Sequence, residues 1–213
     1  MSPARPFLLL AAAVLALALP APARPDAGVL AEVERLAALL ALGPGSTVAD
    51  VGAGDGDYSL ALARRVGPEG RVYATEIDAG KRAEIERAAR AAGLDNVVVV
   101  EATEDATGLR PGCCDAAFLR DVYHHLTKPE PTLASLREAI RPGGRLVVID
   151  FRPSFWLAPW TPEGIPEDRG GHGVRPEIVI KEAEAAGFER AALDEAWRSG
   201  WLHSLYAVSF RRP

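Results

Sequence analysis

The chain has 213 residues, of which 48% are hydrophobic and 25% are charged, and its formal net charge is −5. This composition describes one globular domain with a hydrophobic core and excludes an intrinsically disordered chain. The acidic charge and the lack of a Lys/Arg cluster argue against a nucleic-acid partner. The two cysteines, Cys113 and Cys114, are adjacent and offer no metal-ligand spacing, so no metal site is expected.

The N-terminus has the order of charged, apolar and small residues that marks a targeting segment. Arg5 precedes an apolar run over residues 7–19, and Ala21-Pro22-Ala23 follows as an A-x-A cleavage signature. This order predicts a secretory signal peptide over residues 1–23. The run is short of the roughly 20 residues that a membrane-spanning helix needs. We therefore expect an exported protein, periplasmic or secreted, with a membrane anchor through residues 7–19 as the alternative.

A first helix is expected after this segment. Asp26 can cap it, and Val33, Leu36 and Leu40 recur at helical spacing before Gly43-Pro44-Gly45 ends it. We expect this helix to pack against the sheet edge near the ligand site.

A glycine-rich turn follows the first predicted strand. Residues 48–51 are mostly apolar, and a helical pattern begins at Tyr58, so the sequence reads as strand, tight turn and helix. The turn contains three glycines spaced two apart, which are Gly52, Gly54 and Gly56. Glycines let a ligand lie against bare backbone, but here the third comes one residue earlier than in the dinucleotide pattern G-x-G-x-x-G. Asp50 and Asp55 add negative charge that suits a cationic ligand rather than a pyrophosphate.

Residues 48–56, V-A-D-V-G-A-G-D-G, resemble the first motif of the class I S-adenosylmethionine-dependent methyltransferases. The cofactor of that family carries a sulfonium and an ammonium. The resemblance covers about residues 30–211. It implies that S-adenosyl-L-methionine is the cofactor and that this part of the chain contacts it through Asp50, Gly52, Ala53, Gly54, Gly56 and Tyr58.

An acidic residue ends the second predicted strand. The strand covers residues 71–75, and Glu76 stands at its C-terminal end, 26 residues beyond Asp50. An acid in this position can accept hydrogen bonds from both ribose hydroxyls of an adenosine ligand. We expect Glu76 and the following Ile77 to contact the cofactor.

The third predicted strand is a run of four valines within residues 96–100, preceded by a helix that Asp78 caps. Such a continuous apolar run is typical of a strand covered on both faces. Its exit resembles the third cofactor loop of the family. The resemblance implies that Thr103 and Glu104 lie near the adenine, with a slip of one residue left open.

The fourth predicted strand covers residues 115–119 and runs into Asp121-Val122-Tyr123-His124-His125. This segment resembles the D-V-x-H-H motif of small-molecule methyltransferases, including those of quinone biosynthesis. The resemblance implies that the strand end lies beside the methionine part of the cofactor. Asp121 is then a candidate partner for the ammonium or for the incoming nucleophile.

Methyl transfer from a sulfonium is a direct displacement, in which the protein mainly aligns the reactants and removes water. A general base is needed only for a hydroxyl, an ammonium or a C–H acid. Histidine suits that role near neutral pH, although paired histidines at such a turn can equally cap the helix or pack. The candidates are His124, His125, Tyr123, Asp150 and His172.

A second helix–strand unit follows, with a helix from Pro129 and an apolar strand over residues 146–150. The turn Arg141-Pro142-Gly143-Gly144-Arg145 between them resembles the late motif of the family. Residues 151–173 then lose regular patterning, because prolines interrupt them, yet they hold aromatic residues too apolar for a loop exposed to water. We interpret this segment as a substrate lid over the ligand crevice, with a packed loop as the alternative. Its surroundings include three arginines that could clamp an anionic substrate, Arg152, Arg169 and Arg175.

The chain is expected to close with a helix from Pro176 and two strands over residues 188–197 and 202–211. Residues 24–213 then form an α/β, Rossmann-like three-layer sandwich with a seven-stranded, mostly parallel sheet whose last strand is antiparallel. The predicted function is S-adenosylmethionine-dependent methyl transfer to a small, partly apolar molecule.

Two alternatives remain at this point. The first is an NAD(P)-dependent oxidoreductase, which titration with S-adenosylmethionine and NADH would separate from a methyltransferase. The second is a non-catalytic exported binding module, for which no methyl acceptor would yield S-adenosylhomocysteine. The acceptor atom and the oligomeric state cannot be read from the sequence.

Overall fold

The computed structural model describes residues 26–161, 163–166, 169–200 and 204–213, so the predicted signal peptide lies outside the described residues. Seven strands form a sheet in the order β3-β2-β1-β4-β5-β7-β6. The strands are β1 (Thr47–Val51), β2 (Arg71–Glu76), β3 (Val97–Glu101), β4 (Cys114–Arg120), β5 (Ile140–Phe151), β6 (Glu189–Arg198) and β7 (Leu205–Arg211). The first five are parallel, and β7 runs antiparallel to both β5 and β6. The predicted fold class is therefore confirmed.

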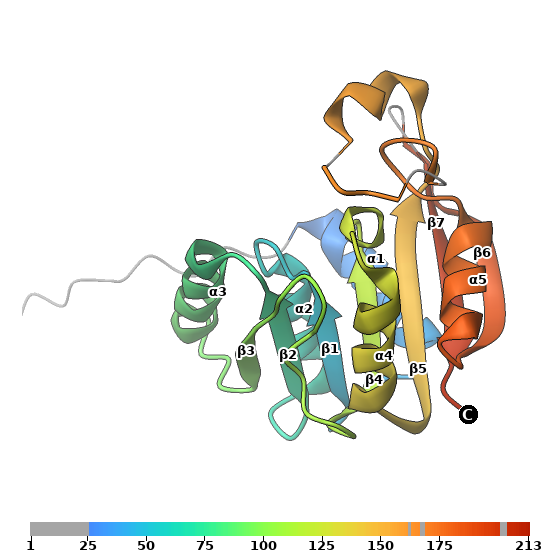
Figure 1. The fold of residues 1–213 in the computed structure, drawn as a ribbon. Helices are drawn as coiled ribbons and strands as arrows, with labels where there is room; N and C mark the ends of the chain where they lie inside the picture. The colour runs from blue at the N-terminus through green and yellow to red at the C-terminus, as the bar shows by residue number, and fades with distance from the viewer. Residues whose placement is uncertain (1–25, 162, 167–168, 201–203) are drawn as a thin grey trace, which may run out of the picture.

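Helices cover both faces of this sheet (Figure 1). They are α1 (Ala27–Leu39), α2 (Asp57–Val66), α3 (Ala79–Ala91), α4 (Pro129–Ala139) and α5 (Pro176–Ala185), with short 3-10 helices η1 (Tyr123–His125) and η2 (Phe155–Trp160). Helices α1 and α2 share a core with Phe118 and Val147. Helices α4 and α5 share a second core with the neighbouring residues Leu119 and Val148, whose side chains point to the other face. These two cores give the three layers.

Helix α1 begins as predicted but packs elsewhere. Asp26 caps it, because its Oδ1 accepts a hydrogen bond from the Gly28 N–H at 2.7 Å. The expected position at the sheet edge is wrong, since Val33 and Leu36 are buried with residues of β1, β4 and β5. Those strands lie in the middle of the sheet order, so a helix that packs over them covers its face.

The valine-rich strand β3 is less buried than its sequence indicates. Its four valines are half-buried, because β3 lies at the end of the strand order, where it pairs with β2. Strand β5 begins at Ile140, earlier than predicted, because it includes the turn that contains Gly143 and Gly144. Its pairing with β4 shifts register between Ile140 and Arg145, and Gly143 has a φ of +81°.

The carboxyl ends of β1, β2 and β4 meet at one edge of the sheet, with β1 between the other two. From β1 the chain continues to β2 on one side, and from β4 it continues to β5 on the other side. Ligands of open α/β sheets bind at such a switch point. The described residues of segment 151–173 project beyond the carboxyl end of β5 (Figure 1). Two of its aromatic side chains are exposed to solvent, Trp156 at 80% and Trp160 at 67%, contrary to the expected burial. No helix among the described residues has the length and apolar character to cross a membrane.

Candidate functional site

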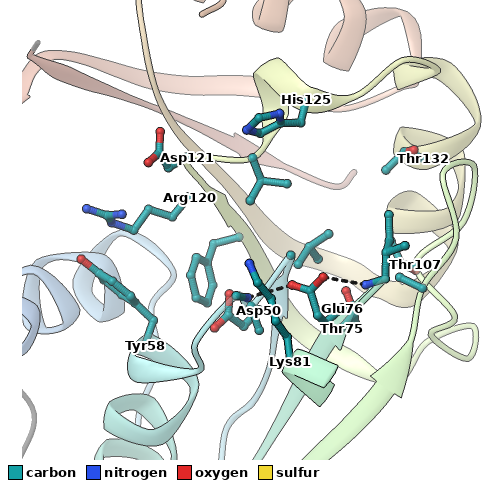
Figure 2. A pocket seen from close by; sticks show the side chains of 18 of the residues that line it. Asp50, Tyr58, Thr75, Glu76, Lys81, Thr107, Arg120, Asp121, His125 and Thr132 are labelled. Atoms are coloured by element: carbon teal, nitrogen blue, oxygen red, sulfur yellow. Dashed lines mark hydrogen bonds between the residues drawn. The ribbon is translucent and has the colours of Figure 1, made fainter. Parts of the chain in front are cut away.

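A cavity of about 550 Å³ opens where β1, β2 and β4 end. Its walls come from the loops after these strands, from the start of α2 and from the loop after β3 (Figure 2). Ten of the residues predicted to contact cofactor or acceptor line it, namely Asp50, Gly52, Ala53, Gly54, Tyr58, Glu76, Ile77, Thr103, Asp121 and His125. Residues from separate parts of the sequence thus converge on one cavity.

The glycine turn is tied to the end of β2 and leaves open space at Gly54. The backbone N–H groups of Gly52 and Ala53 both donate to the Thr75 carbonyl at 2.9 Å. Gly54 has a φ of +56°, and a Cβ there would have no atom nearer than 4.0 Å, so a side chain would enter the cavity. Gly56 is different, because it does not line the cavity and a Cβ on it would meet Ile85.

Glu76 is held by the backbone around it. Its Oε2 accepts from the Gly54 N–H at 2.9 Å, and its Oε1 accepts from the N–H groups of Ile77 and Asp78 at 2.9 and 3.0 Å. The carboxylate is therefore fixed at the cavity wall, as Figure 2 shows. Each carboxylate oxygen can accept more than one hydrogen bond, so capacity remains for a ligand.

Asp50 lies at the base of the cavity and is only 3% exposed. Its Oδ2 accepts from the Ser59 hydroxyl at 2.6 Å. Burial raises the pKa of Asp50 to about 7, because it disfavours the charged form. A cation bound beside this carboxyl would favour its ionised form.

A buried ion pair that the sequence analysis missed supports one wall. Arg120 donates from Nε to Glu32 Oε1 at 2.9 Å, and Trp197 donates to the same oxygen at 2.9 Å. The Tyr58 hydroxyl donates to Glu32 Oε2 at 2.8 Å, and its ring lies 4.7 Å from the Arg120 guanidinium. Burial opposes the charge of Glu32, but these hydrogen bonds keep its pKa below the ordinary value. The burial of Glu32 could have been predicted from the sequence, because Glu32 precedes Leu36 by four residues and so shares the buried face of α1.

The loop after β3 closes the opposite side of the cavity. Thr103 lines the cavity with Thr107, which the sequence analysis also missed, together with Lys81 from α3 and Thr132 from α4. Glu104 does not line it, and its carbonyl accepts a hydrogen bond from the Thr132 hydroxyl at 3.4 Å. The predicted loop is thus at the cavity, with Thr103 rather than Glu104 facing it.

The loop after β4 contributes Asp121 and His125. Asp121 has a φ of +59°, a left-handed conformation that is uncommon outside glycine. His125 lines the cavity, whereas Tyr123 and His124 are buried behind it. The Tyr123 hydroxyl donates to Glu182 at 2.6 Å, and burial raises its pKa. Of the predicted catalytic residues, Asp121 and His125 therefore face the cavity.

A third histidine joins this pair from segment 151–173. The ring of His172 lies 5.0 Å from that of His124 and 5.9 Å from that of His125, centroid to centroid. Burial lowers the pKa values of His125 and His172, and the neighbouring imidazoles add to the effect, so the neutral forms are favoured. His124 is fixed by Asp150, whose Oδ1 lies 2.9 Å from its Nδ1.

The three arginines that could clamp an anionic substrate, Arg152, Arg169 and Arg175, are not part of the cavity lining found for the described residues. Arg169 is fully buried, pairs with Glu182 at 3.0 Å and packs over the Tyr123 ring. Arg152 pairs with Glu195 at 2.7 Å. Two of these arginines thus join segment 151–173 to the last part of the fold.

Comparisons with known proteins agree with this arrangement. A protein family described as a methyltransferase domain matches residues 49–148. The chain is 28% identical over 183 residues, 72% of this chain and 70% of the relative, to the ubiquinone/menaquinone biosynthesis C-methyltransferase UbiE of Ralstonia nicotianae.

Solved structures show the same fold. An S-adenosylmethionine-dependent methyltransferase from Aquifex aeolicus matches with a TM-score of 0.71 and 25% identity, over 89% of this chain and 95% of that chain. A geranyl diphosphate methyltransferase in complex with S-adenosylmethionine matches with a TM-score of 0.69 over 86% of this chain and 85% of that chain. At 17% identity, this second likeness concerns the fold alone.

Proposed function

We propose that this chain is a class I S-adenosylmethionine-dependent methyltransferase whose cavity holds the cofactor beside a small, partly apolar methyl acceptor. The observation that carries the proposal is the pairing of open backbone at Gly54 with the fixed carboxylate of Glu76. These similarities favour neither the nicotinamide-dependent oxidoreductase nor the non-catalytic module.

The residues present fit S-adenosylmethionine. Glu76 offers oriented oxygens to two ribose hydroxyls, and Gly54 leaves room for the ligand against the backbone. The carboxyls of Asp50 and Asp121 suit the ammonium and the sulfonium. When bound, the cofactor supplies a methyl group on a positively charged sulfur that a nucleophile can attack.

The protein's own part is to position the acceptor and exclude water. We place the acceptor beside the loop after β4, where the ionisable side chains of Asp121 and His125 line the cavity. The apolar side chains of Val122 and Leu126 line the same part of it. This mixture suits an acceptor with an apolar body and one polar group. The name of the relative UbiE, a ubiquinone/menaquinone biosynthesis C-methyltransferase, supports a ring of the quinone or quinol type as that body.

Segment 151–173 is proposed to act as the substrate lid. Its support is its place beyond the carboxyl end of β5 and the contact of His172 with His125, which lines the cavity. Deleting the tip of the segment should then raise the KM for the acceptor and leave cofactor affinity unchanged. Equal loss of both affinities would favour a packed structural loop.

Export of the protein is proposed from the sequence of residues 1–23, which lie outside the described part of the chain. A fusion of these residues to a phosphatase active only outside the cytoplasm should produce activity, and the mature N-terminus should begin at Arg24. An active fusion that keeps its first residues would support the anchor alternative instead.

The cofactor site is tested by a matched pair of glycine variants. Gly54→Val should reduce the affinity for S-adenosylhomocysteine below detection in calorimetry, because the side chain enters the cavity. Gly112→Val is the control, since Gly112 also has a left-handed φ, +63°, with open space around it, but lies outside the cavity. Both variants place valine at a similar left-handed φ, so the cavity is the main difference between them.

Two outcomes would contradict the proposed function. Undiminished affinity of a folded Gly54→Val variant would place the cofactor elsewhere. Failure to form S-adenosylhomocysteine from S-adenosylmethionine with any member of a panel of phenols, quinols, thiols and amines would contradict methyl transfer to a small molecule.

A further inference from the structure

We propose that His124, His125 and His172 form a binding site for a divalent transition-metal ion such as Zn²⁺, beside the methyl-transfer cavity. This site was not predicted from the sequence, where the adjacent cysteines offer no metal-ligand spacing and the three histidines are separated by up to 48 residues. Binding of the ion is independent of the proposed function. Its role next to the acceptor rests on that function.

The three imidazoles converge from two distant parts of the chain. His124 and His125 belong to η1, which follows β4, and His172 comes from the segment after β5. One nitrogen of each ring lies within 4.8 Å of a nitrogen of both others. Zinc–nitrogen bonds of about 2.1 Å give a tetrahedral nitrogen set an edge of about 3.4 Å, so small rotations of the rings would close the site.

His124 already has the orientation of a metal ligand. Its Nδ1 is engaged by Asp150 Oδ1 at 2.9 Å, which leaves Nε2 available. Asp150 is completely buried and is itself held, because its oxygens also accept from the backbone N–H groups of His124 and Phe151. A carboxylate that fixes the second nitrogen of a histidine is a common feature of metal sites.

His172 has a polar atom that needs a partner. Its Nδ1 is buried and has no hydrogen-bond partner within the described residues. A buried polar atom without a partner is costly, and a metal ion would satisfy it. The cluster thus combines one oriented imidazole with one unsatisfied nitrogen.

The position of the cluster suggests its use. His125 and Asp121 both line the cavity, and an oxygen of Asp121 lies within 4.8 Å of a nitrogen of His124. Three histidines leave a coordination position open, as in catalytic rather than structural zinc sites. An acceptor hydroxyl bound there would become more acidic and would lose its proton more readily to solvent water. In that state His125 is a ligand and does not take the proton itself.

Zinc binding tests the proposal directly. Untagged full-length protein is stripped with a chelator and titrated with Zn²⁺ by calorimetry, and Co²⁺ absorption reports the ligand geometry. We expect one ion per chain, and a loss of affinity of at least about 100-fold in His172→Gln. Cys113→Ser is the matched control and should bind zinc as the unaltered protein does, because a thiolate is the competing zinc ligand in this chain.

S-adenosylhomocysteine affinity is measured alongside as a control for folding. It should be unchanged in His172→Gln, since His172 is not among the residues that line the cofactor cavity. The proposal is overturned if the unaltered protein binds no zinc, or if Cys113→Ser loses zinc while His172→Gln keeps it. Failure of the methyltransferase assignment would appear separately, as absent S-adenosylhomocysteine binding.

Discussion

Replacing Glu76 by alanine should weaken cofactor binding by a predictable amount. Backbone N–H groups hold the carboxylate at 2.9, 2.9 and 3.0 Å, so a ligand meets it already oriented. Hydrogen bonds to a charged group contribute roughly 1.5 to 3 kcal/mol. The dissociation constant for S-adenosylhomocysteine should therefore rise roughly 12- to 160-fold in Glu76→Ala.

Calorimetric titration of the purified variants measures this change. Glu101→Ala is the matched control, because Glu101 pairs with Glu76 in the register of β2 and β3 and ends its strand in the same way. Its carboxylate binds Arg82 and lies outside the cavity, so its loss should leave the affinity unchanged. Denaturant unfolding of both variants separates a loss of contact from a loss of fold.

The reasoning would be refuted by a folded Glu76→Ala variant whose dissociation constant stays within about twofold of the original. It would also be refuted if Glu101→Ala weakened binding as much, since the effect would then come from charge near the sheet edge and not from the oriented carboxylate.

Two other predictions concern stability and pH. Glu32→Gln should lower the free energy of unfolding, measured by urea titration, by about 3 kcal/mol, because the largely buried Arg120 loses its carboxylate partner. The control is Glu34→Gln, which removes a mostly exposed ion pair and should change the free energy of unfolding by less than about 0.5 kcal/mol. Equal losses would contradict the role of burial. The pKa of Asp50 is about 7, and a bound cation lowers it, so the cofactor binds best when this carboxyl is ionised. Cofactor affinity should therefore fall as the pH decreases from 7 to about 5.5, by at most about tenfold per pH unit. Calorimetry should show a flatter profile for Asp50→Asn, and a flat profile in the unaltered protein would argue against the cation.

Local signals predicted the parts of this protein whose cause is local. Asp26 and Asp78 cap helices, because a side-chain oxygen two or three residues before an unpaired N–H needs no distant contact. The alternation of strands and helices required a mostly parallel sheet, and its strand ends had to share an edge. Asp50, Gly54 and Glu76 could thus be placed in one cavity in advance.

Tertiary structure alone decided features that depend on which strands are neighbours. The valines of β3 resemble a central strand, but their partial burial follows from its place at the edge of the sheet order. Glu32 meets Arg120 across 88 residues, and His172 meets His125 only because β4 and β5 end side by side. A sequence records which residues can be buried or charged. Which of them touch is determined by the pairing and packing of the whole chain, because such contacts join residues far apart along it.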